Sequence, residues 1–447
     1  MDRTLVFEAL LDWNFWGRFN EKLKEREIYP EIPESNICLV IKGVRRSGKS
    51  RLAYLLSKRF NDKDVLIINF EDPRLSKIKG KDIFEVIDIY RENVMPEGPK
   101  LLILDETQNV REWEKAVRTL LETKKHKIIV TGSSSKLMSE EYSSVLTGRH
   151  IDFEVFPLSF REYLIWNSVK LEKLEICKNR QKVIFLLNQY IKFGSFPEVV
   201  KVKSENEKIR LLISYFEDIL IKDVARRYKI REVEKLEELA KNYLSNISCL
   251  QSFNKIKRII KASLDTVERF SRYMEIARLF VFVKKFSSKY KEQTLAPRKV
   301  YTVDTGFFNA LGFKLSENFG RLMENLVAIE LLREGSYFNQ NLEIYYFKTK
   351  EGYEVDFLVK EGLKIKQLTQ VTYANSYDEI DHREIRALLK ANELFKEHKP
   401  ELLCITWDYE DGRQVSWFGK KACIKFIPLW KWLLKLDKEK VAKPKPT

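Results

Sequence analysis

Residues 43–50 read Gly-Val-Arg-Arg-Ser-Gly-Lys-Ser, and an apolar run, Ile37-Cys-Leu-Val-Ile41, precedes them. The glycines at 43 and 48 let the backbone curl, so that its amide groups point at phosphate oxygens. Lys49 can reach the outer phosphates of a nucleotide, and Ser50 can offer its hydroxyl to a magnesium ion. Residues 51–60 have helical spacing, and the dipole at the start of such a helix favours a bound anion. This strand–loop–helix context predicts a nucleoside triphosphate site rather than a chance match in a loop.

The residues expected to contact the nucleotide all belong to this loop or to the first turn after it. They are Gly43, Arg46, Ser47, Gly48, Lys49, Ser50 and Arg51. We expect ATP as the nucleotide and Mg²⁺ as its metal, because the chain has no Asn-Lys-x-Asp motif of the kind that reads guanine.

A second motif, Leu101-Leu-Ile-Leu-Asp105-Glu106, is an apolar strand that ends in two acids. Asp105 is expected at the carboxyl end of this strand, beside the loop, where it can bind magnesium together with Ser50. Glu106 can then take a proton from an attacking water and act as the general base. A strand that happens to end in a polar turn is the alternative.

Two further side chains are candidates for contacts with the nucleotide. A hydroxyl in Thr131-Gly-Ser133-Ser134 could orient water or contact the γ-phosphate, although Ser/Gly turns after strands are common. Arg149 could stabilise the charge that develops in the transition state at a neighbouring subunit's nucleotide. An ordinary surface arginine fits the sequence at least as well.

Length and composition bound the class of protein. With 447 residues the chain should hold two or three domains, because single cores rarely grow past roughly 250–300 residues. The five cysteines and four histidines fall in no disulfide or metal-ligand spacing. Without an apolar run of 18 residues or a signal pattern, we expect a cytoplasmic protein with no membrane span.

The positive charge of the chain is concentrated in one segment. Lysine and arginine exceed the acids by 81 to 65 overall, and residues 241–300 alone hold 14 basic side chains against 4 acidic ones. A localised basic patch indicates a polyanionic partner, most often nucleic acid. The alternative is the solvated surface of a charge-rich protein, as in thermophiles.

The pattern of elements predicts four regions. Strands at 37–42, 65–70, 100–104, 127–131 and 150–156 suit a buried parallel sheet within a first domain, residues 1–160. A helical lid, 161–235, and a winged helix-turn-helix, 236–303, follow, the latter because its order is helix, helix, turn, helix and β-ribbon. An α/β domain over 304–447 completes an α/β fold.

Basic side chains of the third region could contact DNA phosphates and give salt-dependent binding. The candidates are Lys255, Lys257, Arg258, Arg269, Arg272, Lys284 and Lys285. We expect the longer helix of this region to be capped by Asp265 or Thr266. The competing interpretation is that the winged helix only packs against other subunits.

Taken together, the motifs resemble the AAA-type ATPases of archaea and bacteria that carry a winged helix and a C-terminal restriction-endonuclease-like domain. The resemblance implies an AAA+ core, oligomer formation, Ser133 as a sensor and Arg149 as an arginine finger. It rests on Gly43–Ser50, Asn69–Pro73, Asp105-Glu-x-Gln108 with Trp113, Gly132–Ser134, Gly148-Arg149, Pro157–Phe160, Phe196–Glu198, Tyr301–Gly306, Glu324–Val327 and Glu354–Phe357.

The last domain carries only part of a nuclease signature. Nucleases of the PD-(D/E)xK type combine a helix Glu, a strand Asp and a Glu-x-Lys, with the carboxylates on magnesium. Glu324 and Asp356 match the first two, but the next strand reads Gln370-Val-Thr372. Lys364 or Lys366 could substitute for the missing lysine, although both lie earlier on that strand. We expect a vestigial metal site and an inactive or strongly weakened nuclease fold.

The leading hypothesis is an AAA+ ATPase that couples ATP binding and hydrolysis to DNA binding or remodelling, in a task such as repair or recombination. One alternative is an ATP-gated DNA endonuclease that uses the C-terminal domain. The other is a nucleotide-dependent switch that docks proteins.

Overall fold

The structure, a computed structural model, describes residues 2–16, 23–27, 29–34, 37–133, 145–312 and 319–436. The chain forms two compact units. One comprises Met1–Pro157 with two later segments, Asp218–Lys229 and Ile276–Arg278. The other comprises Leu158–Glu217, Ile230–Glu275 and Leu279–Thr447. Among the helices described, none is long and apolar enough to cross a membrane.

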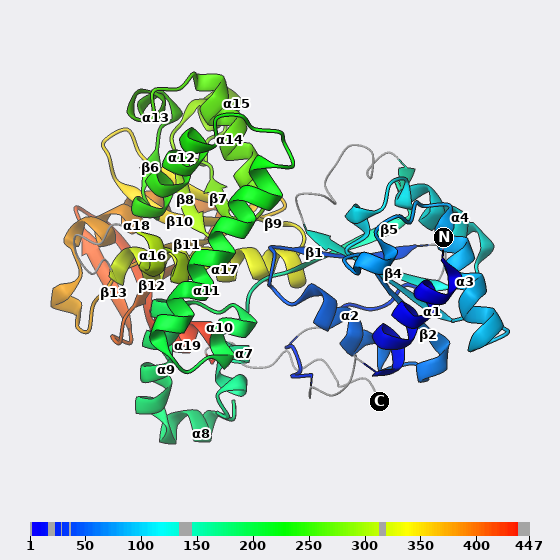
Figure 1. The fold of residues 1–447 in the computed structure, drawn as a ribbon. Helices are drawn as coiled ribbons and strands as arrows, with labels where there is room; N and C mark the ends of the chain where they lie inside the picture. The colour runs from blue at the N-terminus through cyan, green and yellow to red at the C-terminus, as the bar shows by residue number, and fades with distance from the viewer. Residues whose placement is uncertain are drawn as a thin grey trace. The chain divides into compact units, whose positions relative to one another are not determined.

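A five-stranded parallel sheet forms the centre of the first unit, in the order β2-β3-β4-β1-β5 (Figure 1). The strands β2 and β3 are buried at every position, which explains why they read as continuous apolar runs. The predicted parallel sheet is confirmed. Its strands are β1 (Cys38–Gly43), β2 (Val65–Asn69), β3 (Leu101–Asp105), β4 (Lys127–Ser133) and β5 (His150–Val155).

Helices cover both faces of this sheet because successive strand residues point to opposite sides. Val40, Leu66 and Leu102 pack with α1, α3 and α4, whereas Leu39 and Ile67 pack with α2. The helical elements are α1 (Arg3–Leu11), η1 (Asp12–Trp16), α2 (Lys49–Ser57), η2 (Asp62–Asp64), η3 (Pro73–Leu75), α3 (Asp82–Asn93), η4 (Thr107–Asn109), α4 (Trp113–Thr123) and the π-helix η5 (Ile219–Ala225).

The second unit contains a six-stranded mixed sheet in the order β13-β14-β12-β11-β10-β9 (Figure 1). Leu358, Leu368 and Phe426 pack on one side with α18, and Phe357 and Ile405 pack on the other with α17 and with α9 (Arg180–Phe193). The elements are α17 (Phe319–Tyr337), β9 (Leu342–Lys348), β10 (Glu354–Glu361), β11 (Lys364–Val371), η6 (Tyr377–Glu379), α18 (His382–Leu394), η7 (Lys396–His398), β12 (Glu401–Thr406), β13 (Asp411–Trp417), β14 (Lys420–Pro428) and α19 (Leu429–Leu433).

A three-stranded antiparallel sheet, β6-β8-β7, also belongs to the second unit. Its chain order is α12 (Val233–Ser245), β6 (Leu250–Gln251), α13 (Phe253–Ile259), α14 (Leu264–Ile276), β7 (Phe280–Val283), α15 (Tyr290–Leu295) and β8 (Arg298–Thr302). The expected cap of α14 is wrong by two or three positions. The helix begins at Leu264, and Ser263 Oγ accepts a hydrogen bond of 3.0 Å from the Thr266 N–H.

Six further helices complete the described part of the second unit, and a buried aspartate joins two of their connections. Asp304 accepts hydrogen bonds from the N–H of Gly306 and from the N–H and hydroxyl of Ser195. These helices are α7 (Phe160–Trp166), α8 (Lys173–Lys178), α9 (Arg180–Phe193), α10 (Pro197–Lys201), α11 (Glu205–Asp218) and α16 (Thr305–Leu311).

Candidate nucleotide-binding site

The loop between β1 and α2 depends on two glycines. A Cβ at Gly43 would lie 2.2 Å from the Val155 carbonyl oxygen, so no larger residue fits there. Gly48 has φ of 99°, a conformation that L residues with side chains rarely adopt. Helix α2 begins directly after it at Lys49, so the loop ends on the N-terminal turn of a helix.

Lys49 is buried beneath this loop, and its Nζ donates a 3.1 Å hydrogen bond to the Val44 carbonyl. Burial lowers the pKa of Lys49, although the carboxylates of Glu106 and Asp223 act against this shift. The Ser47 hydroxyl is also buried and has no hydrogen-bond partner within the described residues. A buried ammonium and an unpaired hydroxyl fit a loop whose polar groups bind phosphate oxygens.

Asp105 ends β3 and joins this strand to the loop. Its Oδ1 accepts a 2.9 Å hydrogen bond from Ser50 Oγ and another from Thr131 Oγ1, and its Oδ2 accepts one from Tyr54. Burial, aided by the charge of Glu106, raises the pKa of Asp105 to about 6. A serine hydroxyl beside a carboxylate is the ligand pair expected for magnesium at such a loop.

Glu106 follows Asp105 in a left-handed conformation, with φ of 54°. Its N–H donates to Thr131 Oγ1 at 3.2 Å, and its carboxylate accepts a hydrogen bond from Gln108 Nε2. A non-glycine residue in this region costs on the order of 1–3 kcal/mol, and such conformations cluster at functional sites. Thr131 therefore orients both acids from the neighbouring strand, and the predicted pair of acids beside the loop is assembled.

Sequence reasoning missed the anchor of the loop. Arg45 donates hydrogen bonds of 3.1 and 3.2 Å to the two oxygens of Asp223 on η5. Asp223 is 1% exposed, and Arg45 also lies 3.8 Å from Glu71. No motif marks Asp223, because the preceding residues read as one continuous helix and a π-helical turn has no clear sequence signature.

The other predicted residues of this site are placed as follows. Arg46 lies in the loop with φ of 69°, and Arg51 lies on the first turn of α2. Ser133 ends β4, whereas its side chain and all of Ser134 are outside the described residues.

Arg149 does not lie beside the phosphate-binding loop, residues 43–50, of the same chain. Its carbonyl accepts a hydrogen bond from Cys38 N, at the start of β1, whereas the loop follows the end of that strand. Six strand residues place these two ends roughly 16 Å apart. The Arg149 guanidinium pairs with Glu122 at 2.8 Å.

The predicted nuclease residues come together around a lysine. Lys299 Nζ lies 3.0 Å from Glu324, 2.9 Å from Glu354 and 2.7 Å from Asp356. Burial works to lower the pKa of Lys299, but these three carboxylates outweigh it and hold the pKa well above its usual value. Across the described part of the chain, no His, Cys, Asp and Glu side chains form a group of three that could hold a metal ion.

The lysines considered as substitutes in β11 do not reach this cluster. Lys366 pairs with Glu361 at 2.9 Å, and Lys364 is exposed. The sequence signal for Lys299 is weak, because it lies in the basic segment and precedes both acids in the chain.

The residues predicted to contact DNA differ in their exposure and in their ion pairs. Lys255, Arg258, Arg272 and Lys284 are exposed and have no ion pair with any residue in the described ranges, and Lys257 is half-buried. Two others are paired within the chain: Arg269 lies 3.5 Å from Asp265, and Lys285 lies 2.7 Å from Glu292.

Comparison with known proteins places this site in a family. Residues 35–164 match the model of an AAA domain, residues 184–318 match a domain of unknown function (DUF8612), and residues 319–432 match another (DUF4143). The chain is 34% identical over 441 residues to the uncharacterized protein MJ1544 of Methanocaldococcus jannaschii, covering 97% of this chain and 96% of that one. The chain therefore belongs to the same family of AAA-domain proteins as MJ1544.

Other similarities are weaker. An uncharacterized protein of Haemophilus influenzae is 28% identical over 346 residues, which is 75% of this chain and 82% of the relative. Among solved structures, AMPPCP-bound DnaA from Aquifex aeolicus is 18% identical and covers 61% of this chain and 87% of its own, with a TM-score of 0.23.

Proposed function

We propose that the chain is a magnesium-dependent ATPase whose active site is formed by the loop at 43–50 and the end of β3. The observation that carries this proposal is the 2.9 Å hydrogen bond from Ser50 Oγ to Asp105 Oδ1. It brings the loop serine and the strand aspartate together as a ready pair of oxygen ligands. The buried Lys49 and the unpaired Ser47 hydroxyl support the same proposal.

Each residue then has a defined role. The amides of the loop and the Lys49 ammonium bind the phosphates, while Ser50 and Asp105 hold the metal. Bound magnesium neutralises the charge of the phosphates. Glu106 accepts a proton from water, and Gln108 and Thr131 hold its side chain and backbone in place.

The experiment for this proposal is an ATPase assay with Lys49→Ala beside a matched control, Lys58→Ala. Lys58 follows the same helix, α2, at its far end and is exposed. Lys49→Ala should lose nucleotide binding and with it ATP turnover, whereas Lys58→Ala should keep both. Equal ATP turnover in both variants would exclude the site.

We propose further that the site is completed by a second copy of the chain. Arg149 lies at the opposite edge of the sheet from its own loop, so its guanidinium is better placed to reach a neighbour's nucleotide. Homo-oligomer formation follows from this proposal.

We propose that residues 236–303 form a winged helix-turn-helix that binds DNA. The element order α12, α13, α14, β7 and β8 supports it, as do the exposed cations Lys255, Arg258, Arg272 and Lys284. Replacing Lys255, Arg258 and Arg272 with alanine should weaken binding to duplex and branched DNA and flatten its salt dependence. No affinity of the unaltered protein at low salt would favour a protein-docking switch.

A further inference from the structure

The cluster around Lys299 joins two sheets of the second unit. Lys299 lies on β8 of the three-stranded sheet, Glu354 and Asp356 lie on β10 of the six-stranded sheet, and Glu324 lies on α17. The Lys299 side chain is 2% exposed, and those of Asp356 and Glu324 are 8% and 11% exposed. The Glu354 side chain is 26% exposed, so the cluster is buried except on the side of Glu354, and it contains a cation of the protein itself.

The contacts of Lys299 leave its ammonium with no spare donor. An ammonium carries three N–H bonds, and three carboxylates lie within 3.0 Å of this nitrogen. A lysine that assists phosphate cleavage needs a free N–H for the phosphate or the water. Lys299 therefore cannot perform that role in this arrangement.

Two further hydrogen bonds hold acids of the cluster in place. Asp356 Oδ2 accepts a 2.9 Å hydrogen bond from Val371 N, and Glu324 Oε1 accepts one of 2.7 Å from the Tyr301 hydroxyl. Tyr301 lies two residues after Lys299 on the same strand and is fully buried. Strand β8 thus supplies both a cation and a neutral donor to the same glutamate.

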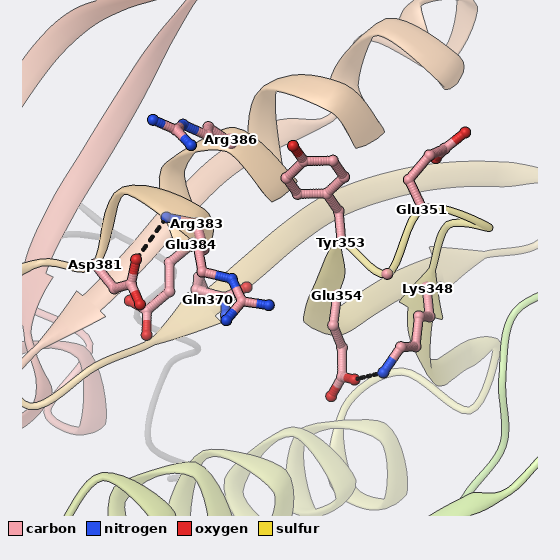
Figure 2. A pocket seen from close by; sticks show the side chains of 10 residues that line it. Lys348, Glu351, Tyr353, Glu354, Gln370, Asp381, Arg383, Glu384 and Arg386 are labelled. Atoms are coloured by element: carbon pink, nitrogen blue, oxygen red, sulfur yellow. Dashed lines mark hydrogen bonds and ion pairs between the residues drawn. The ribbon is translucent and has the colours of Figure 1, made fainter.

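A pocket of about 500 Å³ adjoins the cluster on the side of Glu354. Figure 2 shows Tyr353 and Glu354 pointing in opposite directions, with Lys348 beside the Glu354 carboxylate at 2.9 Å. Gln370 also lines this pocket, and its buried Oε1 has no partner in the described structure. Gln370 stands where a nuclease of this type needs a carboxylate. Glu384 of α18 also lines this pocket, but it has no ion pair with Lys299 among the described residues.

We propose that Lys299 is the resident cation of the Glu324–Glu354–Asp356 cluster: its ammonium takes the position of a divalent metal ion, so the domain holds no metal there and does not cleave phosphodiesters. The carboxylates instead tie β8 to β10 and α17. This inference is independent of the proposed ATPase. The three carboxylates are then a site that the Lys299 ammonium occupies, and not a metal site that has lost ligands.

Mn²⁺ binding without nucleotide tests the proposal, in proteins that also carry Asp105→Asn to remove the metal ligand of the AAA domain. With Lys299 present, electron paramagnetic resonance should detect no Mn²⁺ at the cluster. Lys299→Met should lower the Tm by at least about 5 °C and then bind one Mn²⁺, which restores the Tm. Lys348→Met, which removes a cation from the pocket side of Glu354, is the matched control. It should neither lower the Tm by this amount nor bind Mn²⁺.

The double variant Lys299→Met/Asp356→Asn keeps the formal charge of the cluster at its original value. It should unfold at a higher temperature than Lys299→Met and bind no Mn²⁺. The proposal is overturned if the Lys299-containing protein binds Mn²⁺ and loses it on Asp356→Asn. It is also overturned if that protein cleaves single-stranded or branched DNA with Mg²⁺ or Mn²⁺ and Asp356→Ala abolishes the cleavage. These two arms need no Lys299 variant, so they remain decisive if Lys299→Met fails to fold.

Discussion

Asp223 holds Arg45 through two hydrogen bonds, of 3.1 and 3.2 Å, although 178 positions separate the two residues. Arg45 belongs to the phosphate-binding loop, and Asp223 belongs to a π-helix that the chain reaches only after leaving the first unit and returning to it. The pair therefore anchors the loop to a distant segment. A π-turn at this point agrees with the frequent use of such turns at functional sites.

Removing one member of this pair should destabilise the first unit. Asp223→Asn leaves Arg45 with a neutral partner. We expect the free energy of unfolding to fall by about 3 kcal/mol, the lower end of the range for breaking a buried ion pair. The protection of the α2 amides against hydrogen exchange measures it. Arg45→Met/Asp223→Asn should lose less than the sum of the two single changes. Additive losses would mean that the two side chains do not stabilise each other.

Arg149 allows a complementation experiment. Arg149→Ala should lower ATP turnover on the order of 10³-fold, because the loop of each subunit loses its arginine finger. Lys49→Ala should be inactive for a different reason, the loss of phosphate binding, and it still carries Arg149. Mixing the two inactive proteins should therefore restore part of the activity, as measured by phosphate release. If the mixture stays inactive while the variants assemble together, Arg149 does not act between subunits.

Glu384 should make the stability of the second unit depend on pH. Burial, followed by the charge of Asp356, raises the pKa of Glu384 from 4.5 to about 8. The folded state thus holds this proton more tightly than the unfolded chain does. The stabilisation that this proton gives is complete below pH 4.5 and is lost as the pH rises to 8. Relative to Glu384→Gln, the free energy of unfolding of the unaltered protein should fall by up to about 1.4 kcal/mol per pH unit across this window. Thermal unfolding between pH 5 and 8 measures the difference.

The control for this experiment is Glu397→Gln, which changes an exposed glutamate of the same unit. It should leave the slope of Tm against pH unchanged. A slope that is the same in Glu384→Gln and in the unaltered protein would show that Glu384 does not retain its proton on folding.

Much of the first unit could be predicted because its signals are local. Buried parallel strands read as apolar runs, and the loop and the acid pair each lie within a few residues. The same reasoning failed for β13, whose residues are mostly exposed or half-buried and show no apolar run. Thr131 could have been singled out as a hydroxyl at the end of the strand next to β3, where it orients Asp105 and Glu106.

The contacts of Arg45 and Lys299 could not be predicted, because both depend on segments brought together only by folding. Lys299 lies 57 positions from Asp356, on a strand of a different sheet. In the sequence it is one more lysine in a basic segment. Its burial against three acids, which decides its role, is a property of tertiary structure alone.

In the proposed mechanism, Glu106 acts as the base of ATP hydrolysis at the loop. The most direct test compares ATP affinity and single-turnover hydrolysis in Glu106→Gln and in the unaltered protein, with Mg²⁺ present. The amide of glutamine preserves the shape of the side chain but cannot take a proton from water. We predict unchanged ATP affinity and hydrolysis slowed by about 10²-fold or more. Hydrolysis at the unaltered rate would contradict the assignment of Glu106 and with it the proposed mechanism.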